Sequence, residues 1–273
     1  MSTRAIPAPG AVIIRPRVRG PRSFFTDTMV LTRRNLVLSV RTPELVVFAA
    51  IMPIMFVLLF RYVFGGSIKI AGYDNYVNYL IPGVIVQTAL FGGSSSAVGV
   101  ADDLSKGVMD RLRSLPTNRA SILAARTFAD LVRLAYTMGL LVVVGLLVGF
   151  RPENSAGPVL AAAGIALLFG YACSWLFTLL GLMVRNVESA TLAGSLLTFP
   201  LVFAASTFTS PALMPGPLRV FAENQPVTQV ADALRDLSHG NGFTGHAPVL
   251  AVGWSLGILV VAGLLATWKF RRI

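Results

Sequence analysis

Charged residues are scarce in this chain of 273 residues: they make up 13% of the sequence, whereas hydrophobic residues make up 55%. A soluble domain carries roughly 25% charged residues, with which it covers its surface. The low charge therefore excludes a soluble fold of this length. The formal net charge of +11 fits membrane topology better than a nucleic-acid partner, because the basic residues gather between long apolar segments.

Residues that would indicate an enzyme are also missing. The single cysteine, Cys173, lies inside an apolar run and excludes an intrachain disulfide. The two histidines, His239 and His246, have no nearby cysteine or paired carboxylates, so we expect no metal site. The sequence has no recognisable nucleophile with a histidine and an acidic partner, and no Gly-x-x-x-x-Gly-Lys-Ser/Thr loop that could bind ATP. We therefore predict no catalytic residues.

The chain instead contains a series of apolar segments of roughly 20 residues, the length that crosses a bilayer as a helix. The period-two alternation of a membrane barrel is absent. We therefore expect an all-α polytopic membrane protein with six transmembrane helices. The predicted spans are 44–64, 77–101, 122–150, 158–184, 190–208 and 248–268.

The basic residues predict the orientation. If the N-terminus is cytoplasmic, most of the lysines and arginines fall on the cytoplasmic side, so both termini are expected there. We expect a bacterial-type cytoplasmic membrane, whose anionic lipids would attract the basic N-terminal residues. Residues 1–20 contain no apolar region of the kind found in a cleaved signal peptide, so we expect none. The predicted parts are a basic cytoplasmic tail (1–20), an interfacial amphipathic helix (21–43) and a six-helix transmembrane domain (44–273).

Two further segments are amphipathic and do not span. In 21–40, Phe25 and Met29 begin an apolar row at helical spacing, which predicts a helix that lies in the interface or only anchors the chain. The long loop after the fifth span contains a helix that starts at Pro226, with Arg235 among its polar residues. The helices of this loop either form a re-entrant cap or rest on the surface. We expect the cap, since protein would then cover its backbone.

A short charged segment, GVMDRLRSLP (107–116), lies between the second and third spans. Val108, Leu112 and Leu115 recur at helical spacing, and charged residues occupy the rest of the circumference. Pro116 ends the helix because it disfavours helical geometry at the preceding residue. Such a helix fits a groove on another protein. An interfacial helix that touches only lipid headgroups fits the same pattern.

Three stretches resemble type-2 ATP-binding-cassette (ABC) exporter permeases, notably the daunorubicin-resistance-type drug and lipid exporters. GVMDRLRSLPTNRASILAAR resembles their cytoplasmic coupling segment, and YLIPGVIVQ resembles the start of their second span. FTSPALMPGPLRVFAENQPVTQVADALRDL resembles their outer-loop signature, although Gln225 here separates the asparagine from the Pro-Val-Thr. The resemblance implies a permease subunit that pairs with a second copy or a homologue and with two separate ATPase subunits. It implies no cofactor in this chain, since ATP and Mg would bind the ATPase.

The resemblance also implies a role for the charged segment. It would insert into a cleft on the ATPase, whose closure on nucleotide would push on the second and third spans. The long third span would act as a lever, on which Arg126, Asp130 and Arg133 can pair; alternatively, Asp130 only neutralises its neighbours. The predicted ATPase-coupling residues are Gly107, Val108, Met109, Asp110, Arg111, Leu112, Arg113, Leu115 and Pro116.

Gln87 and several hydroxyl side chains in the second and fifth spans mark a possible translocation path, although small and hydroxyl residues also allow close helix packing. The predicted path residues are Gln87, Thr88, Ser94, Ser95, Ser195, Thr198 and Ser206. A single six-helix chain would form only half of a channel, so it must pack against a partner chain. The first and fifth spans have regular apolar stripes that fit such a contact. The predicted dimer interface comprises Phe48, Met52, Phe56, Phe60, Ala193, Leu197 and Leu201.

We therefore expect the membrane subunit of an ATP-driven ABC exporter. Its substrate would be an amphipathic drug, lipid or glycolipid moved out of the cytoplasm or the inner leaflet. One alternative is an ion-coupled secondary carrier, but it needs intramembrane carboxylates, and only Asp130 comes close. Another alternative is a non-transporting membrane scaffold or sensor subunit, which would need neither an external cap nor a lever helix.

Overall fold

The computed structural model describes residues 21–41, 43–65, 70, 72–73, 75–109, 119–240 and 242–272, and these are helical apart from short connections. The predicted tail (1–20) lies outside them. Four helices are long and apolar enough to cross a membrane. They are α3 (Tyr76–Ser105), α5 (Arg119–Val148), α6 (Ala156–Met183) and α10 (Ala247–Arg272). Two shorter apolar helices flank them: α2 (Pro43–Leu59), extended by the π-helical turn η1 (Phe60–Phe64), and α7 (Val187–Phe203).

Local sequence explains where these helices begin. The side chain of Asn75 accepts a hydrogen bond from the Val77 amide at the start of α3. Asn186 does the same for the Ser189 amide at the start of α7, where Glu188 also meets the positive end of the helix dipole. These six helices match the six predicted apolar segments to within a few residues at most boundaries, the end of α7 excepted.

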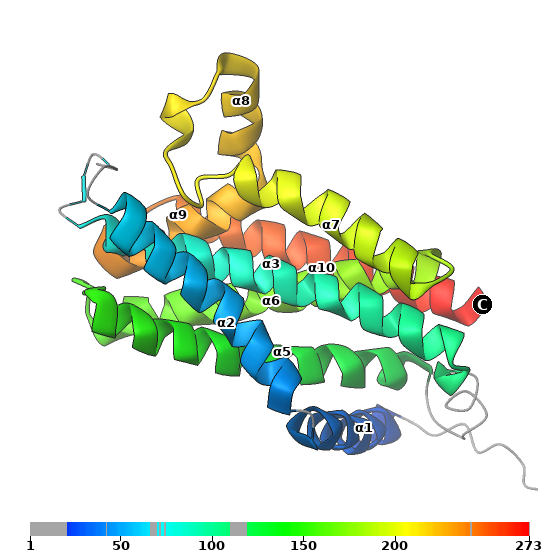
Figure 1. Cartoon of the computed structure of the whole chain (residues 1–273). Helices are drawn as coiled ribbons and strands as arrows, with labels where there is room; N and C mark the ends of the chain where they lie inside the picture. The colour runs from blue at the N-terminus through cyan, green and yellow to red at the C-terminus, as the bar shows by residue number, and fades with distance from the viewer. Residues whose placement is uncertain are drawn as a thin grey trace, which may run out of the picture.

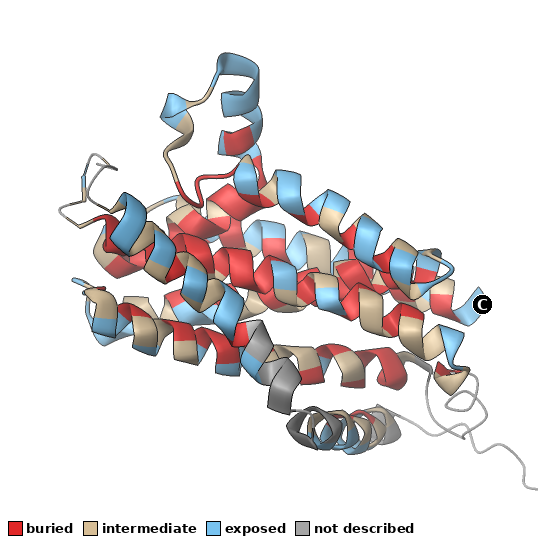
Figure 2. Ribbon diagram, in the orientation of Figure 1, coloured by how far each residue is buried: buried red, intermediate tan, exposed pale blue. Residues whose placement is uncertain are grey.

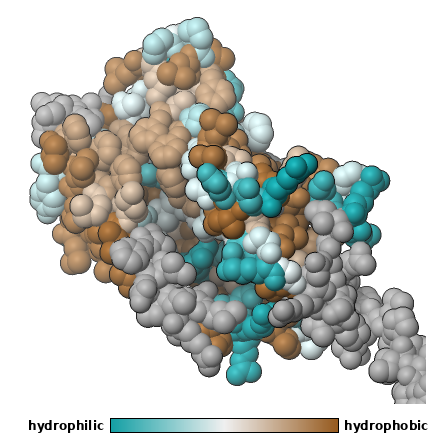
Figure 3. Space-filling view, turned by 45° about the vertical axis from the view of Figure 1, so that its right-hand side comes forward, coloured by the Kyte–Doolittle hydropathy of each residue, from teal (hydrophilic) through white to brown (hydrophobic). Residues whose placement is uncertain are grey.

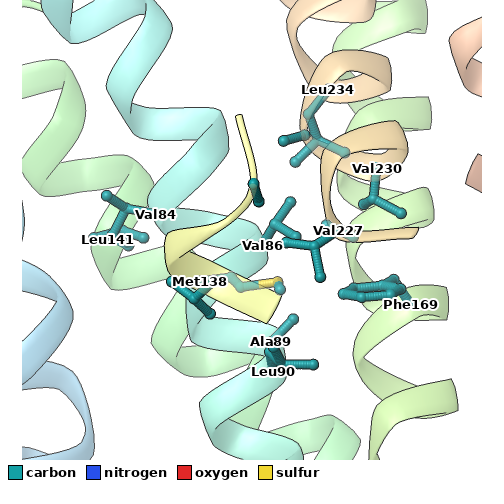
Figure 4. Close-up of a cluster of buried hydrophobic side chains, with 14 of the residues drawn as sticks. Val84, Val86, Ala89, Leu90, Met138, Leu141, Phe169, Val227, Val230 and Leu234 are labelled. Carbon is teal, nitrogen blue, oxygen red and sulfur yellow. The ribbon is translucent and has the colours of Figure 1, made fainter. Parts of the chain in front are cut away.

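Helix α3 is the centre of the bundle, in contact with α2, α5, α6, α7 and α9 (Figure 1). Its first half is almost wholly buried (Figure 2). Figure 4 shows the core there, where Val86 and Leu90 of α3 lie near Met138 of α5, Phe169 of α6 and Val227 of α9. A Cβ at position 83 of α3 would overlap the carbonyl of Thr207, so glycine is required for the segment after α7 to approach α3.

The connection between α7 and α10 consists of η2 (Pro211–Leu213), α8 (Gly216–Asn224), α9 (Pro226–His239) and η3 (Gly242–Thr244). These elements lie differently. Helix α8 projects from the bundle and is mostly exposed, whereas α9 packs between α3, α6 and α10 (Figures 1 and 2). Pro226 starts α9 and Gly240 follows its end, as the sequence predicts.

Helix α1 (Pro21–Arg41) lies crosswise to the long helices and is seen nearly end-on in Figure 1. It packs against α5, where the Thr32 hydroxyl donates to the Ala125 carbonyl at 3.3 Å. Phe25 and Met29 are more than two-thirds exposed on it. These two side chains therefore point away from the bundle, whereas Thr32 faces α5. Figure 3 shows hydrophobic residues over most of the visible face, with the hydrophilic ones gathered beside the grey segments.

Candidate functional site

The end of the bundle at which α3 and α5 are connected, here called the hairpin end, carries the start of the predicted coupling segment. Gly107 has φ +66°, a left-handed conformation that favours glycine and turns the chain out of α3. Met109 is almost completely buried, in a cluster with Ile122 and Leu123 of α5. The chain after α3 is therefore held against the start of α5. Val108 is half-buried, and the remaining predicted coupling residues lie outside the described ranges: Asp110, Arg111, Leu112, Arg113, Leu115 and Pro116.

An ion pair joins α3 to α5 near this end. Asp103 of α3 accepts a hydrogen bond from the Arg126 guanidinium of α5, and both side chains are about a quarter exposed. Gly99 lies beside this pair, and a Cβ there would overlap the Arg126 guanidinium. Glycine at position 99 is therefore what lets the arginine reach its partner.

A second polar cluster joins the same helices two turns further along α5. The Arg133 Nη2 donates to Asp130 Oδ1 at 3.0 Å and to the Ser95 hydroxyl at 2.7 Å. The Ser96 hydroxyl donates to the other carboxylate oxygen of Asp130 at 2.6 Å. Asp130 thus pairs with Arg133, whereas Arg126 pairs with Asp103 across the helix interface. Together the two clusters fasten α3 to α5 over about 10 Å of helix.

The predicted path residues divide between the interior and the surface. Gln87, Thr198 and Ser206 are buried, whereas Ser95 is exposed. Gln87 Oε1 and Thr198 Oγ1 have no hydrogen-bond partner within the described residues. The Thr88 hydroxyl is buried but bonded to the Val84 carbonyl of its own helix, and Ser94 and Ser195 are half-buried.

The predicted interface residues lie on α2, η1 and α7. Met52 is 66% exposed and Leu197 is 37% exposed, whereas Phe56, Phe60, Ala193 and Leu201 are half-buried. The side chain of Phe48 lies outside the described ones. Phe56 and Phe60 stack on Phe208, with ring centroids 5.9 and 4.6 Å away, so α2 and the chain after α7 pack together through aromatic rings.

The sequence pattern predicts that Arg235 lies on the polar side of an amphipathic outer helix, but its side chain is only 4% exposed. Its Nε donates to the Tyr79 carbonyl of α3, and its Nη2 donates to the Ser206 and Thr207 carbonyls after α7. Its Nη1 bonds Asp232 at 2.7 Å and the Ser206 hydroxyl at 2.9 Å. The guanidinium also lies 3.6 Å from the Tyr79 ring centroid.

These bonds satisfy a stretch of non-helical backbone inside the bundle. The Tyr79 and Tyr76 hydroxyls donate to the Ser206 and Phe208 carbonyls at 2.7 and 2.9 Å. The Thr228 hydroxyl accepts the Ser206 amide, and the Gln225 side chain donates to the Ala204 carbonyl. Buried backbone groups need such partners. We call this set, centred on Arg235 and the backbone of 204–208, the carbonyl clamp.

The comparisons with known proteins agree with one another. The profile of the ABC-2 type transporter family matches residues 26–238. The chain is 31% identical to the daunorubicin resistance ABC transporter permease protein DrrB1 of Streptomyces coeruleorubidus, over 81% of this chain and 78% of that protein. This chain belongs to the ABC-2 type transporter permeases. The permease is also 27% identical to a protein named as the doxorubicin resistance ABC transporter permease DrrC of Mycobacterium tuberculosis, over 92% of this chain and 90% of that protein.

Family membership fixes what the subunit is. The permease is a multi-pass membrane protein and the membrane subunit of an ABC transporter, and it lacks the ATPase domain. Permeases of this kind pair with ABC ATPase subunits and carry no cofactor. No group of three or more metal-binding side chains occurs among the described residues.

Proposed function

We propose that the permease exports an amphipathic drug, lipid or glycolipid from the cytoplasm or the inner leaflet, driven by two ATPase subunits. The hairpin of α3 and α5 carries this proposal. Two polar clusters hold α3 and α5, the helices before and after the loop, against each other. One is the pair Asp103–Arg126, and the other is Asp130–Arg133 with Ser95 and Ser96. A push on that loop then displaces both helices together. The names of the drug-resistance relatives support the substrate class.

In this proposal the hairpin end is cytoplasmic, both termini lie there, and α2 with η1, α3, α5, α6, α7 and α10 are the six spans. The basic residues near this end support the orientation. Residues 107–116 dock on the ATPase, and α1 lies in the cytoplasmic interface. Helix α9 is the re-entrant part of an external cap, which its packing against α3, α6 and α10 supports.

The translocation path lies between two copies of the permease, or between this chain and a homologue, which meet through α2 and α7. The exposed apolar side chains on these helices, Met52, Leu196 and Phe203 among them, support the assignment. An ion-driven carrier is less well supported, because both carboxylate oxygens of Asp130 are already hydrogen bonded to Arg133 and Ser96.

Mutation of the coupling loop tests the proposal. Leu112→Asp with Leu115→Asp puts charge on the predicted docking face, so the ATPase should no longer copurify and ATP-driven transport should cease. Leu213→Asp with Leu218→Asp, at exposed positions on η2 and α8, is the matched control and should leave both intact. Equal membrane insertion shows that folding is unaffected. If the loop variant retained its ATPase and transport, the coupling assignment would be wrong.

A cross-linking experiment tests the path separately. Single cysteines replacing Phe56 and Leu201 in a Cys173→Ser background should cross-link between chains in membranes. A cysteine replacing Leu160 of α6, whose side chain is 72% exposed, should not. Cross-linking through α6 alone would rule out the proposed interface.

A further inference from the structure

Arg133 of α5 uses only part of its hydrogen-bonding capacity. Its Nη2 makes both of its hydrogen bonds, to Asp130 and Ser95. Its Nε and Nη1 make none among the described residues, and its side chain is 30% exposed. A guanidinium has five N–H donors, so the three on Nε and Nη1 have no acceptor among the described residues.

The position of Arg133 along α5 makes these donors costly. It lies about 22 Å from the Val148 end of a helix that rises about 1.5 Å per residue. The hydrocarbon core is about 30 Å thick, so in the proposed orientation Arg133 is within the inner leaflet's acyl region. Arg126 lies about 10 Å closer to the cytoplasm, near the headgroups. Ionisable residues at such depth are rare and mark substrate or ion pathways.

The cluster presents its positive side outward. The two oxygens of Asp130 are taken by Arg133 and Ser96, and its side chain is only 13% exposed. The exposed part therefore includes the guanidinium edge, which is able to donate. The Ser95 hydroxyl accepts from Arg133 and already donates to the Gly92 carbonyl at 2.7 Å. One helical turn away on the same face of α3 lies Phe91, 37% exposed, with the Phe199 ring 5.8 Å from it. Donors and apolar surface thus adjoin each other.

We propose that Arg133, held by Asp130 and Ser95, recognises the anionic headgroup of an amphipathic substrate, a phosphate or a carboxylate, while the apolar part lies against Phe91 and Phe199. The guanidinium fork matches the geometry of either group. Asp103–Arg126 lies on the same seam at headgroup depth, so a headgroup entering from the inner leaflet passes one pair before it reaches the other. This inference rests on the proposed export function and names its substrate class.

The test uses the purified full-length permease and two photoactivatable probes with the same twelve-carbon diazirine chain. One probe ends in a phosphate and the other in a trimethylammonium group. We expect the phosphate probe to label the region of Phe91 and Ser95 about tenfold more than the ammonium probe, as one charge-assisted hydrogen bond predicts. Equal labelling of this region by both probes would overturn the proposal.

Variants separate recognition from structure. Arg133→Gln with Asp130→Asn removes both charges without leaving one unpaired, and it should abolish the preference while the thermal stability stays near that of the wild type. Arg219→Gln with Glu223→Gln, an exposed pair on α8, is the matched control and should keep the preference. A preference that survives in the first variant would contradict the role of Arg133.

Two further measurements complete the test. One distinguishes an amphipathic ligand from a small anion, and the other separates this inference from the proposed export function. Excess inorganic phosphate should not compete with the phosphate probe, since it lacks the apolar part. Full competition would identify a site for small anions and refute the proposal that the ligand is amphipathic. The assay needs no ATPase. If the headgroup preference is absent while the Leu112→Asp, Leu115→Asp variant still loses transport, this inference fails and the export function stands.

Discussion

Arg235 and Arg133 both lie inside the helical bundle, but their surroundings use them in opposite ways. Arg235 is almost completely buried, and all three of its guanidinium nitrogens donate hydrogen bonds. Arg133 is partly exposed, and a single nitrogen makes its bonds. A buried charge is tolerated when its donors are satisfied. Arg235 therefore holds the structure together, whereas Arg133 keeps donors available for a ligand.

The acceptors explain the difference. Arg235 binds mainly backbone carbonyls of Tyr79, Ser206 and Thr207, which cannot change with a side-chain substitution. Arg133 binds a carboxylate and a hydroxyl. Removal of Arg235 leaves the buried Thr207 carbonyl without its side-chain donor and the Ser206 carbonyl with the Tyr79 hydroxyl alone. No second substitution can supply a donor of that shape.

Arg235→Met should therefore have the largest effect on stability. We expect a loss of about 3–5 kcal/mol, as for a buried charge network that loses one partner, and a melting temperature lower by about 10 °C. Thermal unfolding of the purified permease measures it. Arg219→Met, which breaks an exposed pair on α8, should change the melting temperature by little. A similar small change for Arg235→Met would contradict the carbonyl clamp.

Gly99→Ala should come next, because the new Cβ would overlap the Arg126 guanidinium and displace it from Asp103. The Arg126 side chain is flexible and can shift, but only by giving up its ion pair with Asp103, so we expect Gly99→Ala to be about 1–2 kcal/mol less stable than the control below, which gains the same helix propensity. Gly139→Ala on α5 is the control, since nothing lies within 4 Å of a Cβ there; it should be neutral or stabilise the helix by up to about 1 kcal/mol. If Gly99→Ala and Gly139→Ala were equally stable, Gly99 would not be needed to position the Asp103–Arg126 pair.

The sequence predicted the six apolar helices and most of their ends because span length and Asn, Gly and Pro signals are local. Contacts between helices could not be predicted in the same way. The spacing of Arg126 and Asp130 fits an ion pair along one helix, but in the structure Arg126 pairs with Asp103 of α3 instead. Arg235 has the spacing of a polar residue on an amphipathic helix, and nothing in that spacing indicates that three carbonyls from other elements surround it.

Arg133→Met should cost about 1–2 kcal/mol, since it leaves the Asp130 carboxylate without its cation in a partly buried place. Adding Asp130→Asn should restore most of this loss. At the carbonyl clamp, adding Asp232→Asn to Arg235→Met should restore little, because the hydrogen bonds from Arg235 to the Ser206 and Thr207 carbonyls are still missing. Thermal unfolding of the two single and two double variants measures these changes in stability. If the second substitution restored the same share of the loss in both cases, the proposed difference between Arg133 and Arg235 would be wrong.

The smallest effect concerns pH. Burial lowers the pKa of His239, whose Nε2 contacts the Arg151 carbonyl at 2.9 Å and whose Nδ1 is buried without a partner in the described residues. The Tyr73 and Phe150 rings also face it, and the Glu153 carboxylate opposes the shift. A neutral histidine is therefore favoured in the fold, and its contribution is present above pH 6.5 and lost as the pH falls below it.

Between pH 7.5 and pH 5.5 the permease should therefore lose less than about 1 kcal/mol through this group. His239→Gln should remove that part of the pH dependence. Burial raises the pKa of the neighbouring Asp236. Asp236 is present in both the wild type and the His239→Gln variant, so its contribution cancels when the two are compared. If the melting temperatures of both proteins fell in parallel over this range, His239 would not be the group that titrates.

Transport by the intact complex tests the central claim most directly. The permease isolated from its native membrane together with its own ATPase is reconstituted into liposomes, and ATP-dependent movement of fluorescent alkyl phosphate and alkyl trimethylammonium probes is measured. We predict ATP-dependent transport that favours the phosphate probe in the wild type, and transport without that preference in the Arg133→Gln, Asp130→Asn variant. Absence of ATP-dependent transport of either probe by the wild-type complex would contradict the account.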